Sequence, residues 1–182
     1  EHSFFVGFGQ KYYLEGIKNG YRTTSIETVV SDDGQAETVY RDLYLSPFPC
    51  LPRSLYFDND KPRWMNPLDS TSQLTYEQTF REFLDRKTLF VKNYTEGLES
   101  SEANAAERQV LTFFEHEVEA NFKLLQDICT QLEELLNEGY CLEVIAEGDA
   151  SPLASAEYNQ RLTGRRISCV RNYLKTWNGG AL

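Results

Sequence analysis

The stretch that decides the fold is Glu147-Gly148-Asp149-Ala150-Ser151, followed eleven residues after Ser151 by Leu162-Thr163-Gly164-Arg165-Arg166. The mostly apolar run Cys141–Ala146 precedes it, and Ser155 lies where a helix N-cap is expected. A helix N-terminus favours an anion, and an arginine further along the helix can add a two-pronged hydrogen bond to a carboxylate. The pattern therefore predicts a strand end, a polar loop and a helix that together bind a small carboxylate ligand.

Two segments upstream of this stretch have helical periodicity. Apolar residues recur every three or four positions from Tyr76 to Tyr94 and again from Val110 to Leu136, where Gly139 provides a C-cap. The polar residues 96–108 between them predict a loop or an irregular helix start. The last helix is expected to begin at about Ser155.

Short apolar runs at 54–57 and 141–146 are interpreted as strands, which sets a β-α-α-β-α order. This order predicts an α+β sandwich, with helices packed on a small mixed sheet and a short β-rich segment ahead of it. The two strands are expected to be adjacent and parallel, joined by a right-handed crossover.

The first part of the chain is rich in Tyr, Val and Thr and reads as β-hairpins with turns such as Lys18-Asn19-Gly20. The candidate strands are 12–14, 24–30 and 38–45. Prolines between 47 and 52 then predict a boundary. We expect residues 1–48 to be the tail of a β-sandwich domain, and residues 49–182 to be a second domain with helices inserted at about 63–110.

The charge, the apolar content and the motifs of the chain exclude several classes of function. The chain has 182 residues and a formal net charge of −10, which argues against a nucleic-acid surface. It has no apolar run long enough to span a membrane, and its first residues read as the interior of a strand, so we interpret it as a fragment of a longer protein. The sequence contains no G-x-S-x-G motif and no Cys-His pairing, which favours a binding module over an enzyme.

The four cysteines bear on metals and redox state. They are widely spaced without a C-x-x-C pair, which argues against structural zinc and favours buried free thiols, with one disulfide as the alternative. His116 lacks a second histidine four residues on and is expected on a solvated helix face. No metal and no cofactor are expected.

Three segments carry a resemblance to a known family. They are Leu55-Tyr56-Phe57-Asp58-Asn59-Asp60-Lys61, the stretch 147–151, and Tyr158-Asn159-x-x-Leu162-x-x-Arg165-Arg166. In order and spacing they resemble the F-D-x-[DN]-K, E-G-H-T-D and Y-N-x-x-L-S-x-x-R segments of the OmpA-like peptidoglycan-binding domain. The resemblance covers about residues 50–182.

The resemblance implies non-covalent binding of the peptidoglycan stem peptide through diaminopimelate. Arg166 takes the place of the family arginine. An ungapped alignment puts Ser151 at the family's aspartate and Asp149 at its histidine, while a gapped alignment restores Asp149 as the acidic ligand. The other ligand-binding residues that the resemblance implies come from the turn and from the helix: Asn59, Asp60, Asn159 and Leu162. Arg165 is expected to be a surface charge.

The variant of the second motif is similar to that of multidomain Bacteroidota envelope proteins, such as anchor lipoproteins of the type IX secretion system. The resemblance then implies a periplasmic, outer-membrane-associated protein that holds an assembly to the cell wall, with other envelope or secretion proteins as further partners. The preceding segment would be the end of a carboxypeptidase-regulatory-like domain. The alternative is a structural or protein-interaction module that keeps the fold and lacks the ligand.

Overall fold

The computed structural model describes residues 5–7, 9–18, 21–32, 38–47, 54–151 and 153–182. The chain divides into two compact units, Glu1–Pro49 and Cys50–Leu182, which are treated separately below. Both helices and strands are present, so the fold class is α+β, with the strands in the first unit and the helices in the second.

The first unit contains a two-stranded antiparallel sheet of β1 (Lys11–Gly16) and β2 (Thr24–Val29), in which Lys11 faces Val29 and Gly16 faces Thr24. Exposed and partly buried side chains alternate along both strands, as the period of two predicted. The hairpin is therefore confirmed, although its turn residues 19–20 lie outside the described part.

The third predicted strand of this unit, 38–45, is wrong. Those residues are not paired in a ladder, and the contacts beside them are a single bridge between Tyr21 and Pro47 and a bond from Arg22 N to Ser46 O of 2.8 Å. Tyr40 and Tyr44 are exposed. Aromatic and β-branched content favoured a strand there, but a strand also needs a partner for its backbone groups.

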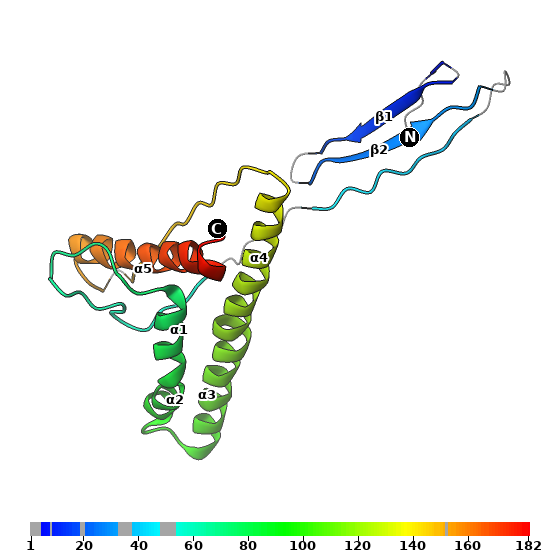
Figure 1. Ribbon diagram of the computed structural model, residues 1–182. Coiled ribbons are helices and arrows are strands. Elements are labelled where there is room, and N and C mark those ends of the chain that lie inside the picture. Colours follow the sequence, from blue (N-terminus) through cyan, green and yellow to red (C-terminus); the bar gives the residue numbers. More distant parts are fainter. Residues whose placement is uncertain (1–4, 8, 19–20, 33–37, 48–53, 152) are drawn as a thin grey trace. The chain divides into compact units, whose positions relative to one another are not determined.

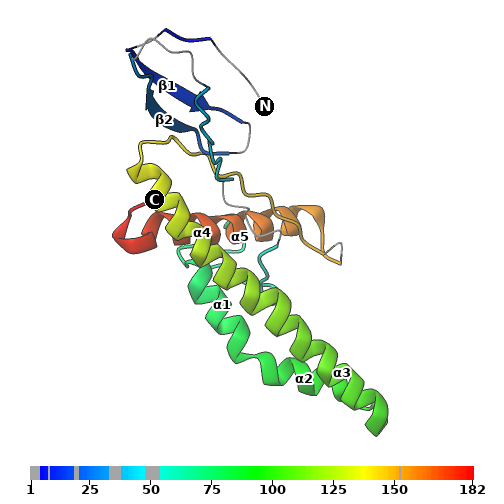
Figure 2. The same ribbon diagram turned by 90° about the vertical axis from the view of Figure 1, so that its right-hand side faces the viewer.

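The second unit is built on a helical hairpin that a further helix crosses (Figure 1). Its first arm consists of α1 (Tyr76–Asp85) and α2 (Lys87–Thr95). Its second arm is one long rod made of α3 (Ser100–Phe113), the π-helical turn η1 (Phe114–Glu119) and α4 (Ala120–Asn137). The crossing helix is α5 (Ala156–Thr176), and a 3₁₀ turn η2 (Trp177–Gly179) follows it. The view in Figure 2 shows the same crossing of α5 over the hairpin.

The helix ends follow local sequence. Thr75 caps α1 in a capping box, in which Thr75 Oγ1 accepts from Gln78 N at 3.3 Å and Gln78 Oε1 accepts from Thr75 N at 2.8 Å. Gly139, at φ +90°, ends α4 with bonds from its own N to Leu136 O and from Tyr140 N to Leu135 O, both 3.0 Å. The predicted caps at Gly139 and Ser155 are confirmed.

Two helix predictions need correction. The periodic segment 76–94 is interrupted at Arg86, whose backbone (φ −90°, ψ 0°) ends α1 and begins α2. The polar segment 96–108 is mostly helical, because α3 already begins at Ser100. Acidic and alanine residues favour a helix at this exposed position even without an apolar stripe.

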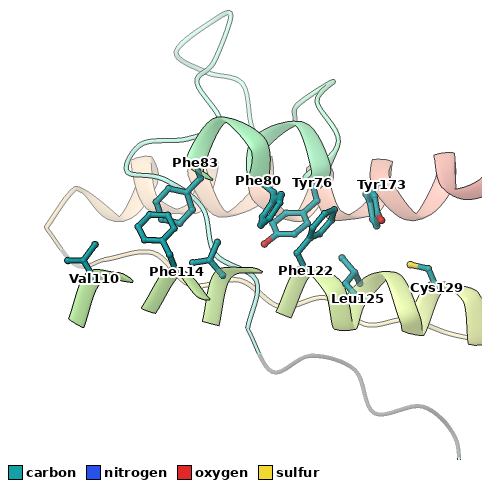
Figure 3. Packing of buried hydrophobic residues seen from close by; sticks show 10 residues of the cluster. Tyr76, Phe80, Phe83, Val110, Phe114, Phe122, Leu125, Cys129 and Tyr173 are labelled. Atoms are coloured by element: carbon teal, nitrogen blue, oxygen red, sulfur yellow. The ribbon is translucent and has the colours of Figure 1, made fainter. Parts of the chain in front are cut away.

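The core of the second unit lies between the two arms and α5 (Figure 3). Aromatic rings dominate it: Phe80 of α1 stacks on Phe122 of α4 at 4.1 Å between centroids, and Tyr173 of α5 lies 5.8 Å from Phe122. Phe114, in the π-helical turn, lies 4.9 Å from Phe83. Aromatic contacts therefore join the first arm to the second, and the second arm to α5.

The strands predicted at 54–57 and 141–146 are not formed in the described structure, and neither is the sheet that was to join them. Leu55, Tyr56 and Phe57 pack on the helical core, with Tyr56 5.0 Å from Phe113 and Phe57 5.2 Å from Tyr76. Their apolar character is explained by helix packing. Ile145, in the second run, is 73% exposed, so apolar composition there does not mark burial.

Candidate functional site

The site begins at the turn Asp58–Lys61, which follows the packed segment 55–57. Asp58 is 2% exposed, and its carboxylate accepts from Asn59 N at 2.7 Å and from the Arg86 guanidinium. Lys61 N closes the turn on Asp58 O at 3.1 Å, and Asp60 takes a left-handed φ of 55°. This ordering directs the carbonyls of Asp58 and Lys61 toward α5.

Arg166 of α5 receives those carbonyls. Its Nε donates to Lys61 O at 3.0 Å, Nη2 to Asp58 O at 3.3 Å and Nη1 to Asp149 O at 3.5 Å, while the guanidinium lies 5.4 Å from the Phe57 ring centre. Burial lowers the pKa of Arg166, and the nearby Asp60 charge opposes that shift. A guanidinium has five N–H donors, so this one keeps capacity for a ligand.

Arg165 is buried rather than a surface charge, which corrects the sequence interpretation. It is 1% exposed, and it donates from Nε to Pro62 O at 2.9 Å and from Nη1 to Asp69 O at 2.8 Å. Its Nη2 has no hydrogen-bond partner among the described residues. The guanidinium lies 5.3 Å from the Trp64 ring centre and 5.9 Å from that of Tyr158.

Neither arginine is within salt-bridge distance of a carboxylate in the part of the chain that the structure describes. Their acceptors there are backbone carbonyls, which neutralise no charge. The Asp60 charge lies near Arg166 without forming an ion pair with it, so a carboxylate ligand would add a direct partner that uses the remaining N–H donors. Arg166 is partly exposed and suited to bind an anion, whereas Arg165 is 1% exposed and holds the segment 62–69.

The loop before α5 lies close to the same arginine. Asp149 meets Arg166 through its carbonyl oxygen, and Ser151 O accepts from Asn159 Nδ2 at 2.8 Å. The side chains of Asp149 and Ser151 are both exposed and bond to none of the described residues. Either side chain is available to a ligand, so each of the two alignments has an exposed polar group at the acidic position.

The other residues predicted for the site differ in availability. Asp60 Oδ1 accepts from Tyr158 OH at 2.9 Å, and burial, followed by this bond, raises the pKa of Tyr158. Asn59 is exposed on the turn. The side-chain amide of Asn159 fixes the loop by donating to Ser151 O. The Leu162 side chain is 5% exposed and packs in the interior. Thus Asp60 and Asp149 lie near Arg166, and Asn59 and Ser151 are exposed on the same turn and loop. The prediction that Leu162 contacts a ligand is wrong, because its side chain is buried.

The sequence pattern assigned no role to three residues of this region: Asp58, Arg86 and Trp64. Asp58 lies within the first motif and follows an apolar run directly. Arg86 lies between Phe83 and Phe90 in an apolar stripe, and a charge in such a place is a signal for a buried partner. Trp64 has no periodic neighbours, so only the tertiary structure could place it.

A close backbone approach holds the segment after Pro62 against α5. A Cβ built on Gly164 would lie 2.5 Å from Ser70 O, and Asn172 Nδ2 donates to Ser72 O at 2.8 Å and to Leu74 O at 3.0 Å. Residues 70–74 therefore run along α5 as a strap that depends on Gly164.

Gly164→Ala should lower the free energy of unfolding by about 1–3 kcal/mol, because the added methyl group displaces a backbone carbonyl. At an open helical position the same change stabilises by about 1 kcal/mol, so the sign of the effect is diagnostic. Urea denaturation measures it, with Gln160→Ala, an exposed position on α5, as the near-neutral control. A Gly164→Ala protein at least as stable as the wild type would contradict the close approach.

No family model, curated protein or solved structure matches this chain. Within the described residues, no helix is both long and apolar enough to cross a membrane, and no cluster of three or more His, Cys, Asp or Glu side chains is arranged to hold a metal ion.

Proposed function

We propose that residues 50–182 bind the stem peptide of peptidoglycan non-covalently and anchor a periplasmic, outer-membrane-associated assembly, such as a secretion system, to the cell wall. The observation that carries the proposal is Arg166, which is partly exposed, donates to backbone carbonyls and forms no ion pair among the described residues. The three motifs of the OmpA-like resemblance supply this arginine and the groups around it.

In this proposal Arg166 binds the side-chain carboxylate of diaminopimelate with the N–H groups that the backbone carbonyls leave free. The ammonium group at the same end of the ligand needs acceptors. The exposed carboxylate of Asp149 and the hydroxyl of Ser151 supply them beside Arg166, and Asp60 and Asn59 supply further oxygens from the turn. Such a site recognises the zwitterion as a whole, because each charge has its own partner.

Retention on purified sacculi tests the proposal. Arg166→Ala should weaken retention by about tenfold or more, the cost of one charge-assisted contact. Arg171→Ala is the matched control, because Arg171 is an exposed arginine on the same helix. Unfolding curves are recorded in parallel, since Arg166 also bonds the loop and the turn. No retention of the wild type, or equal retention of Arg166→Ala at equal stability, would contradict the proposal.

The alternative function is a structural or protein-interaction module without a wall ligand. It is favoured by the three carbonyl bonds of Arg166, which give the residue a purely structural use. Asp149→Ala and Ser151→Ala separate the two functions, because neither side chain bonds a described residue. Weaker retention in either variant with unchanged stability supports a ligand site and identifies the acidic or hydroxyl partner. Full retention in both favours the module.

A further inference from the structure

The segment 62–69 forms an ordered platform beside the proposed site. Arg165 bonds both of its ends, at Pro62 O and Asp69 O. Within it, Asp69 Oδ2 accepts from Asn66 N at 2.8 Å, and Asn66 Oδ1 accepts from Leu68 N at 3.0 Å. The segment is therefore held in one conformation by side-chain bonds and by a buried guanidinium.

This ordered segment exposes large apolar side chains. Trp64 is 38% exposed, Met65 97% and Leu68 74%. The Trp64 ring contacts the Tyr158 ring edge-to-face at 5.7 Å between centroids and lies over the Arg165 guanidinium. A tryptophan fixed in this way offers a flat apolar surface without losing side-chain freedom on binding, which favours a ligand with an apolar face.

The platform is linked to the carboxylate site by one aromatic residue. Tyr158 contacts Trp64 with its ring and Asp60 with its hydroxyl. In peptidoglycan the stem peptide is joined through its N-terminus to an amino sugar, a few residues ahead of the diamino acid. Each extended residue spans about 3.5 Å, so the sugar of a bound stem peptide can reach a surface next to the site.

We infer that Trp64 is the stacking surface for the carbohydrate ring of the bound wall fragment, with Met65 beside it. This inference rests on the proposed function and adds a second ligand class, an amino sugar, to the peptide. A sugar ring presents C–H groups on its faces and hydroxyls at its rim, so a flat aromatic surface binds the face while water solvates the rim. The net charge of −10 argues against a nucleobase as the stacked ring.

Calorimetric titration of the full chain with two probes tests the inference: a free stem peptide containing diaminopimelate, and the same peptide carrying its disaccharide. The wild type should bind the disaccharide-peptide about tenfold more tightly, the size of one aromatic stacking contact. Trp64→Ala should remove that difference and leave the affinity for the free peptide unchanged. Trp64→Leu, which keeps apolar volume but no flat ring, should also remove it.

Tyr94→Ala is the control, because Tyr94 is a 63% exposed aromatic residue on α2 outside the platform. Equal affinity of the wild type for the two probes would overturn the stacking role while leaving the proposed peptide site intact. Binding of neither probe would overturn the proposed function itself. An equal loss of affinity for both probes in Trp64→Leu would show that Trp64 only supports the peptide site. If the wild type is retained on phosphatidylethanolamine vesicles and Trp64→Ala is not, the platform binds a membrane instead.

Discussion

Replacing Arg86 by leucine is expected to lower the free energy of unfolding by about 3–5 kcal/mol, because it leaves the buried carboxylate of Asp58 without its cationic partner. Asp58 is 2% exposed, whereas the Arg86 side chain is 43% exposed. The loss of stability therefore depends on which of the two partners is removed. Removing the arginine leaves a buried negative charge without a positive partner, while removing the carboxylate leaves a guanidinium that water can still reach.

The asymmetry gives a sharp test by urea denaturation. Asp58→Asn should cost less than Arg86→Leu, and adding Asp58→Asn to Arg86→Leu should restore about 2 kcal/mol, because the asparagine carries no charge to bury. Arg81→Leu is the control: Arg81 pairs with Glu77 on the same helix at 2.6 Å, but it is exposed, so its loss should leave stability nearly unchanged. Equal effects of Arg86→Leu and Arg81→Leu would show that the buried pair does not form.

Arg86→Leu should also weaken binding to sacculi. The pair fixes the turn that presents Asp58 O and Lys61 O to Arg166. Arg86 lies at the junction of α1 and α2, so its bond to Asp58 joins the helical hairpin to the turn, as the bond from Lys61 Nζ to Glu82 Oε2 at 3.0 Å also does. If the variant unfolds more readily yet binds sacculi as tightly as the wild type at low temperature, the pair stabilises the fold without shaping the binding site.

The sequence predicted those features that depend on local pattern. The alternation in 11–16 and 24–29 is a hairpin, and the stripes from Tyr76 and Val110 are helices, because each pattern matches the period of one element. The sequence did not predict features that depend on a contact with a residue far away in the chain. Arg165 is buried because carbonyls about a hundred positions earlier receive its N–H groups, and no local pattern encodes that.

The predicted strands failed for a related reason. A short apolar run has the same composition whether it pairs in a sheet or packs on helices, and periodicity cannot separate the two. Tyr56 and Phe57 used their rings against Phe113 and Tyr76. The carbonyls of the turn and of the loop still meet at Arg166 of α5 without a sheet between them, and the ligand site itself stays a prediction.

The second large effect is expected at Phe122. Its ring stacks on Phe80 of α1, and it also contacts Tyr76 and Tyr173, so one side chain joins α1, α4 and α5. Phe122→Ala should cost about 3–5 kcal/mol, since the cavity removes contacts on three helices at once. Phe122→Leu, which keeps most of the volume, should cost about 1–1.5 kcal/mol. Denaturant unfolding compares them, with the 41% exposed Leu124 changed to alanine as control.

Thiol labelling shows whether the damage is confined to this unit. Cys129 and Cys169 are buried and free, and burial raises the pKa of Cys129 to about 11, while Cys141 is exposed. Labelling requires a thiolate that the reagent can reach, so among the three cysteines in the described part of the wild type Cys141 should react first and the buried pair only on opening. Phe122→Ala should accelerate labelling of Cys129 by about two to four orders of magnitude, because each 1.4 kcal/mol of lost stability raises the open population about tenfold. Unchanged labelling alongside a reduced unfolding free energy would place the loss outside the packing of α4 against α5, and would mean that the helix carrying Arg166 is held by the strap rather than by this core.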